Sequence, residues 1–116
     1  RQSTDTLAVE DQNVSKAAHY ILAHACDGIQ VGDVVEQTKL TRRVLETRFK
    51  KVLNKTPHEL ITITRLSKAE RLLRETALTL DQIAGRCGLE YPEYLSVLFR
   101  KHRNMTPGEF RQQHRQ

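Results

Sequence analysis

The stretch PHELITITRLSKAERLLRET, residues 57–76, connects two copies of one sequence pattern. It predicts a single helix, because proline is favoured at the first helical position and apolar residues recur along one side. These residues are Leu60, Ile61, Leu66, Ala69, Leu72 and Leu73. Nothing in the stretch is typical of a catalytic site, so its importance lies in what it connects.

The two copies are related by a fixed offset of fifty residues. Seven identical residues recur without a gap: Leu45, Phe49, Lys51, Asn54, Thr56, Pro57 and Glu59 return as Leu95, Phe99, Lys101, Asn104, Thr106, Pro107 and Glu109. We interpret this as a duplication around a connecting helix. About nineteen helical residues span roughly 28 Å, close to the ~34 Å between successive major-groove faces of DNA.

The charge of the chain is distributed unevenly. Its net charge is +5, but residues 1–40 hold three Lys/Arg and six Asp/Glu, whereas residues 41–116 hold sixteen and eight. The repeat and its connecting helix therefore lie in a part with a balance of +8. Such a part is compatible with nucleic acid, an anionic membrane or an acidic protein as partner, and charge alone does not choose.

The periodicity predicts an all-α fold of seven helices, in which a short helix, a tight turn and a longer helix form a helix-turn-helix unit twice. This is a homeodomain-like duplication. We divide the chain into an arm or interdomain linker (1–12), a first helix-turn-helix subdomain (13–56), a linker helix (57–76) and a second helix-turn-helix subdomain (77–116).

Local signals place the helix ends. Asn13 is the predicted N-cap of the first helix, and Thr79 with Gln82 forms a predicted capping box. Asn54 and Asn104 are predicted to end the two longer helices in the left-handed conformation. The residues predicted to face inward in the shorter helices are Val14, Ala17, Ala18, Ile21, Leu22, Ala25, Val31, Val34, Val35, Leu80, Ile83, Ala84 and Cys87.

The two longer helices, residues 42–53 and 92–103, carry the candidate site. The predicted inward residues are Leu45, Phe49, Val52, Leu95, Leu98, Phe99 and His102; those on the opposite faces are Arg43, Glu46, Thr47, Lys50, Glu93, Ser96, Val97 and Arg100. A helix fits the major groove, and residues near its N-terminus reach base edges.

Side-chain chemistry predicts which groups read bases. Arg43 is predicted to bind guanine in a bidentate manner, and Glu46 to accept a hydrogen bond from a cytosine amino group. Thr47 or Val97 is predicted to contact a thymine methyl group, and Arg42 a base or a phosphate. The residues predicted to contact phosphates are Thr41, Lys50, Lys51, Arg100, Lys101 and Arg103. For the basic side chains among them, the alternative is that they are charged groups exposed to solvent without a partner.

Catalytic and metal-binding patterns are poorly represented. The sequence contains no Gly-rich phosphate loop, no Cys/His cluster at zinc spacing and no Gly-x-Ser-x-Gly motif. Glu59 and Glu109 recur with the fold, which favours a capping role over acid–base chemistry. Cys26 and Cys87 are interpreted as buried, reduced side chains rather than a disulfide or reactive thiols. We therefore predict no enzyme activity, no cofactor and no metal.

Three motifs in the chain resemble the DNA-binding domain of AraC/XylS-type bacterial transcription activators. They are Thr41-x3-Leu45-x3-Phe49-Lys50, Ile83-Ala84-x3-Gly88-Leu89 and Thr106-Pro107-x2-Phe110-Arg111. The resemblance covers residues 13–113. It implies two helix-turn-helix subdomains on a linker helix, each with a recognition helix in the major groove, in a cytoplasmic, nucleoid-associated regulator.

A narrower resemblance, to the xylose-type regulators of this family, is carried by His24-Ala25-Cys26-x-Gly28-Ile29 and Arg42-Arg43-x-Leu45-Glu46. It implies a sugar-sensing domain N-terminal to residues 1–12. It also implies base-reading positions at Arg42, Arg43, Glu46, Thr47, Tyr91, Glu93, Ser96 and Val97. Because Thr47 and Val97 replace an arginine common in the family, no target sequence is transferred from relatives.

Two other functions remain open from the sequence. A repair methyltransferase can carry a similar DNA-targeting domain, and a cysteine-ligand zinc domain upstream would favour it. The basic face is also compatible with an acidic protein partner, such as an RNA polymerase subunit. No apolar run approaches the ~18 residues of a membrane-spanning helix, so no membrane partner is expected.

Overall fold

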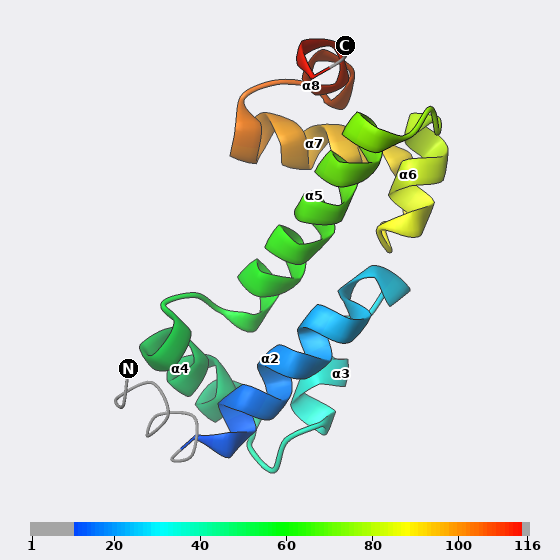
Figure 1. Ribbon diagram of the computed structural model, residues 1–116. Coiled ribbons are helices and arrows are strands. Elements are labelled where there is room, and N and C mark those ends of the chain that lie inside the picture. Colours follow the sequence, from blue (N-terminus) through cyan, green and yellow to red (C-terminus); the bar gives the residue numbers. More distant parts are fainter. Residues whose placement is uncertain (1–10, 115–116) are drawn as a thin grey trace. The chain divides into compact units, whose positions relative to one another are not determined.

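The computed structural model describes residues 11–114, which form seven α-helices, one 3-10 turn and no strand (Figure 1). The predicted all-α fold and its helix count are confirmed. The elements are α2 (Gln12–His24), η1 (Ala25–Asp27), α3 (Val31–Glu36), α4 (Arg42–Leu53), α5 (Pro57–Glu75), α6 (Leu80–Arg86), α7 (Pro92–Arg103) and α8 (Pro107–Gln113). The predicted arm lies outside the described residues except for its last two positions.

The chain forms two compact units. The first contains the residues up to Ala25 together with Ile29–Thr62, and the second contains Cys26–Gly28 and Ile63–Gln116. Thus α2, α3 and α4 belong to the first unit, α6, α7 and α8 to the second, and the division lies within α5.

The core of the first unit is formed by three helices and the start of α5. Phe49 and Leu45 of α4 are fully buried against Ile21 of α2 and Val34 of α3. Leu22, which was predicted to face inward, is 59% exposed. The prediction was wrong because the buried residues of α2 form a narrow stripe, and Leu22 lies about 100° around the helix from Ile21.

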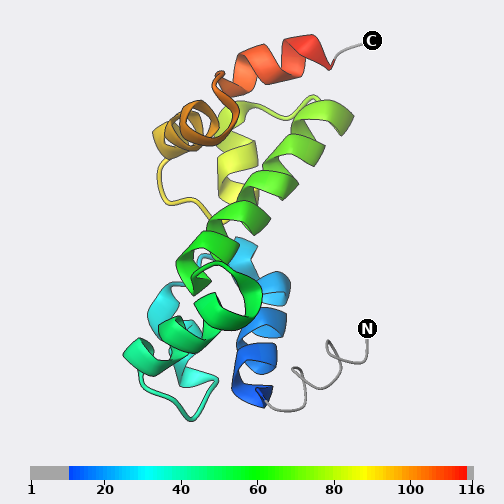
Figure 2. The same cartoon turned by 90° about the vertical axis from the view of Figure 1, so that its left-hand side faces the viewer.

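The core of the second unit is centred on α7. Phe99 is fully buried, and its ring meets that of Phe110 edge to face at 5.5 Å between centroids. Two predicted inward residues lie at the surface: Leu80 is 36% exposed, and His102 is also exposed. The turn that joins α6 to α7 is the yellow loop in Figure 2.

The N-terminus of α2 differs from the prediction. Asp11, not Asn13, is the N-cap, and its carboxylate accepts a hydrogen bond from the Val14 amide at 3.4 Å. The Asn13 side chain instead accepts a hydrogen bond from the Lys39 amide at 3.2 Å. Asn13 therefore ties the turn between α3 and α4 to α2, a contact that a local pattern does not reveal.

The predicted capping devices of the duplication are confirmed. In each Thr-Pro-x-Glu copy the glutamate accepts from the threonine amide, at 2.8 Å for Glu59 and 2.9 Å for Glu109. The hydrogen bond from the Thr56 backbone lowers the pKa of Glu59. Asn54 and Asn104 end α4 and α7 with φ of 61° and 59°, in the left-handed region.

We expect Thr79→Ala to lower the free energy of unfolding by about 1 kcal/mol, as loss of an N-cap does. The Thr79 hydroxyl accepts from the Gln82 amide at 3.2 Å, and the Gln82 side chain accepts from the Thr79 amide at 2.9 Å. Urea unfolding followed by circular dichroism measures the change. Thr79→Ser retains the hydroxyl and is the control, so equal losses in both variants would contradict the capping role.

Candidate nucleic-acid interface

Helix α4 presents a polar face because its apolar residues are held in the core. Thr41 caps its start, with the hydroxyl accepting from the Val44 amide at 3.3 Å. Burial of Leu45 and Phe49 turns the opposite face, with Arg43 and Thr47, into solvent. The structure therefore exposes Arg42, Arg43, Thr47, Lys50 and Lys51 and leaves Glu46 half-buried.

The side chains on this face are not equally engaged. Arg42 forms an ion pair with Glu46, with Nε 3.2 Å from Oε2, and the Thr47 hydroxyl donates to the Arg43 carbonyl at 3.0 Å. The Arg43 guanidinium has no ion pair or hydrogen bond to another described residue. Arg43 is thus available to a ligand without breaking a contact, whereas Glu46 already shares its Oε2 with Arg42.

Arg48, also on α4, pairs with Asp11, with Nη1 4.0 Å from Oδ1. The carboxylate that caps α2 therefore also contacts α4. The sequence did not predict this pair, because the two residues are far apart in the chain.

Helix α7 is the second of the two longer helices with an exposed face. It begins with Tyr91 as N-cap and Pro92 at its first position, and Leu95, Leu98 and Phe99 hold it in the core. Tyr91 is 62% and Val97 53% exposed. Glu93, Arg100 and Lys101 are exposed too, and Ser96 is half-buried. Tyr94, which was not predicted to contact DNA, is also exposed on this helix.

The last turn of α7 is basic, with Arg100, Lys101, His102 and Arg103 in succession. Arg103 is half-buried and forms an ion pair with Glu70 of α5, so it already has a structural partner. Its phosphate contact stays a prediction.

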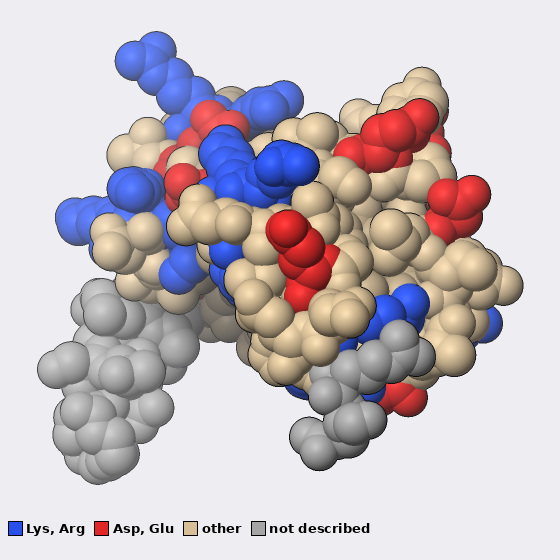
Figure 3. Space-filling view, turned by 90° about the horizontal axis from the view of Figure 1, so that it is seen from above, with Lys and Arg blue, Asp and Glu red and all other residues tan. Residues whose placement is uncertain are grey.

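In a space-filling view, Lys and Arg side chains gather toward one side of the visible face (Figure 3).

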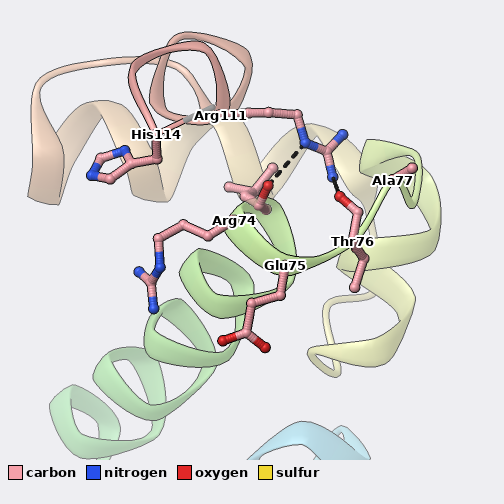
Figure 4. A pocket seen from close by; sticks show the side chains of 7 residues that line it. Arg74, Glu75, Thr76, Ala77, Arg111 and His114 are labelled. Carbon is pink, nitrogen blue, oxygen red and sulfur yellow. Dashed lines mark hydrogen bonds between the residues drawn. The ribbon is translucent and has the colours of Figure 1, made fainter. Parts of the chain in front are cut away.

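Arg111 holds α8 against the C-terminal end of α5. Its Nε donates to the Leu73 carbonyl at 3.1 Å and its Nη2 to the Thr76 carbonyl at 3.0 Å (Figure 4). These carbonyls end a helix, where partners are otherwise lacking. The adjoining pocket is lined by Leu73, Arg74, Glu75, Thr76, Ala77, Arg111 and His114.

Within residues 11–114, no three His, Cys, Asp or Glu side chains gather as a metal site would require. No described helix is both long and apolar enough to cross a membrane.

Comparison with known proteins identifies this arrangement. Residues 34–113 match the family described as helix-turn-helix domain. The chain is 40% identical over 111 residues to the xylose operon regulatory protein of Haemophilus influenzae, covering 96% of this chain and 29% of that protein. It therefore spans less than a third of that relative's length.

Solved structures agree. The DNA-binding domain of AdpA, a global transcriptional factor crystallised with a target DNA, superposes with a TM-score of 0.81 and 25% identity, covering 86% of this chain and 90% of that one. An AraC-type regulator from Chromobacterium violaceum superposes with a TM-score of 0.79 and 29% identity, covering 92% and 96%.

This chain belongs to the helix-turn-helix domain family. Within it, the resemblance to AraC/XylS-type DNA-binding domains is confirmed, and so is the narrower one to the C-terminal region of the xylose operon regulator.

Proposed function

We propose that the chain binds double-stranded DNA sequence-specifically, as the DNA-binding domain of a bacterial, sugar-responsive transcription regulator. The observation that carries this proposal is the pair of helix-turn-helix units, each with an exposed recognition helix. The balance of +8 over residues 41–116 supports it, because neutralising phosphates supplies most of the affinity of such proteins.

Base contacts and phosphate contacts are made by different side chains. Bases are read by Arg42, Arg43, Glu46 and Thr47 of α4 and by Tyr91, Glu93, Ser96 and Val97 around the start of α7. Phosphates are bound by Thr41, Lys50, Lys51, Arg100, Lys101 and Arg103, of which Arg103 is also paired with Glu70. Exposure of the basic side chains on both helices supports this division.

The two subdomains (13–56 and 77–116), joined by the helix at 57–76, place their recognition helices in adjacent major grooves. The length of the connecting helix supports this spacing. The acidic Glu93 makes α7 the weaker reader, because a carboxylate near phosphates is repelled.

The whole regulator carries a sensor domain N-terminal to this region, acts in the cytoplasm and is not an enzyme; the relatives described above, which are transcription regulators, support this. RNA polymerase is a further proposed partner, and contact with it does not exclude DNA binding.

The test is binding to duplex DNA across a salt series. A duplex selected by the protein from a randomised pool is compared with random duplex of equal length. We expect preference for the selected duplex and a log–log salt slope of roughly −4 for about four or five phosphate contacts. Footprinting should protect two regions about one helical turn apart.

Two results would argue against the proposal. Equal affinity for selected and random duplex would leave a non-specific binder. No binding at low salt would exclude DNA as the ligand of this domain and would favour an acidic protein partner.

A further inference from the structure

Two cysteines that are 61 positions apart in the chain belong to the same compact unit, the second one. Cys26 lies in η1, and Cys87 is the C-cap residue of α6. Both are free thiols; Cys87 is buried, as the sequence predicted, whereas Cys26 is only half-buried. The interpretation of both as buried apolar side chains was therefore wrong for Cys26.

The backbone of Gly88, next to Cys87, packs against the backbone of Cys26. A Cβ atom added to Gly88, the neighbour of Cys87, would lie 2.8 Å from the Cys26 carbonyl carbon and 2.9 Å from its oxygen. Cys87 is the residue next to Gly88 in the chain, so it lies beside Cys26, and each thiol shifts the pKa of the other. The segment Cys26–Gly28 belongs to the second unit although both its chain neighbours belong to the first.

The surroundings make the two thiols unequal. The hydrogen bond from Cys87, aided by the positive charges of Lys68 and Arg65, outweighs burial and Asp27 and lowers the pKa of Cys26 to about 7. The same hydrogen bond and burial raise the pKa of Cys87. The accessible thiol is thus the more readily ionised one, and the buried thiol is its donor.

We propose that Cys26 and Cys87 form a dithiol site that a hydroperoxide oxidises to a disulfide, with Cys26 as the nucleophile and Cys87 as the resolving thiol. This role lies outside DNA binding and does not depend on it. Thiolate character and exposure decide which cysteine reacts first, and disulfides in reducing compartments are transient and regulatory.

The chemistry balances in two steps. The Cys26 thiolate attacks one oxygen of the peroxide, the O–O bond breaks, and with one proton taken up the products are a sulfenic acid on Cys26 and water, or an alcohol for an organic hydroperoxide. The Cys87 sulfur then attacks the Cys26 sulfur, the S–O bond breaks, and the hydroxide leaves as water with the proton of Cys87. The peroxide is reduced by two electrons, and the two thiols are oxidised by two.

The first experiment uses the unchanged 116-residue chain and a small excess of hydrogen peroxide, followed by alkylation and mass spectrometry. We expect a monomer lighter by two hydrogen atoms, resistant to alkylation, with one peptide pair linked through Cys26 and Cys87, and recovery of both thiols with dithiothreitol. The proposal would be overturned if the only disulfides formed were intermolecular, or if the cysteines were over-oxidised without forming the Cys26–Cys87 link.

Matched variants test the division of roles. In Cys87→Ala the sulfenic acid on Cys26 should persist and be trapped by dimedone, whereas Cys26→Ala should leave Cys87 unlabelled. The pH midpoint of Cys26 alkylation should rise in Cys87→Ala, which lacks the donor, and rise less in Cys87→Ser, which retains a hydroxyl. Equal midpoints in the wild type and both variants would refute the hydrogen-bonded pair, and circular dichroism checks that each variant is folded.

Discussion

Replacing Gly88 by alanine is expected to lower the free energy of unfolding by about 2–5 kcal/mol, from about 1–2 for a side chain in the left-handed region and about 1–3 for overpacking. Gly88 has φ of +82°, and its Cβ would lie 2.8 Å from the Cys26 carbonyl carbon and 2.9 Å from the Gly28 nitrogen. These are backbone atoms, so no side-chain rotation relieves the overlap. Urea unfolding followed by circular dichroism measures the loss.

Gly28→Ala is the matched control for this prediction. Gly28 has φ of +85°, almost the same conformation, but its Cβ would meet only the Gly88 carbonyl oxygen, at 4.0 Å. It should therefore show the conformational cost alone, about 1–2 kcal/mol. If the two variants lost equal stability, close packing of Gly88 on the segment Cys26–Gly28 would be refuted.

Features encoded by neighbouring residues could be predicted from the sequence. The Thr-Pro-x-Glu capping boxes, the Thr79 cap and the left-handed asparagines at 54 and 104 each depend on residues within one helical turn. The same physics operates in both copies of the repeat, which is why the duplication was a reliable guide to seven helices.

Features that depend on packing between elements could not be predicted from the sequence. Leu22, Leu80 and His102 fit an apolar or inward pattern but are exposed, because the width of a buried stripe is set by the elements packed on it. The partners of Arg103 and Arg111 lie 33 to 38 residues away in the chain. A local pattern carries no information about such contacts.

The candidate site shows the same division. Exposure of Arg43, Thr47 and Lys50 follows from helical period, since Leu45 and Phe49 fix the opposite face. Whether a side chain is already engaged is a tertiary or rotameric property. Only the structure distinguishes Arg42, which is paired with Glu46, from Arg43, which is not.

Arg43→Ala is expected to weaken binding to the selected duplex by about 1–3 kcal/mol and to lower the ratio of selected to random affinity. A guanidinium that binds guanine through two parallel hydrogen bonds discriminates bases, whereas a charge near phosphate does not. The guanidinium is exposed and unpaired among the described residues, so its removal leaves no buried group unsatisfied and should not affect folding. Fluorescence anisotropy with both duplexes measures the ratio.

Two further variants separate shape from charge. Arg43→Lys keeps the positive charge but loses the planar pair of donors, so it should lower the affinity ratio while leaving the salt slope unchanged. Lys51→Ala, on the same helix, should weaken binding to both duplexes alike and reduce the slope by about one unit. If Arg43→Lys kept the wild-type ratio of selected to random affinity, Arg43 would act as a positive charge near the phosphates. Base reading by α4 would then depend on Arg42, Glu46 and Thr47.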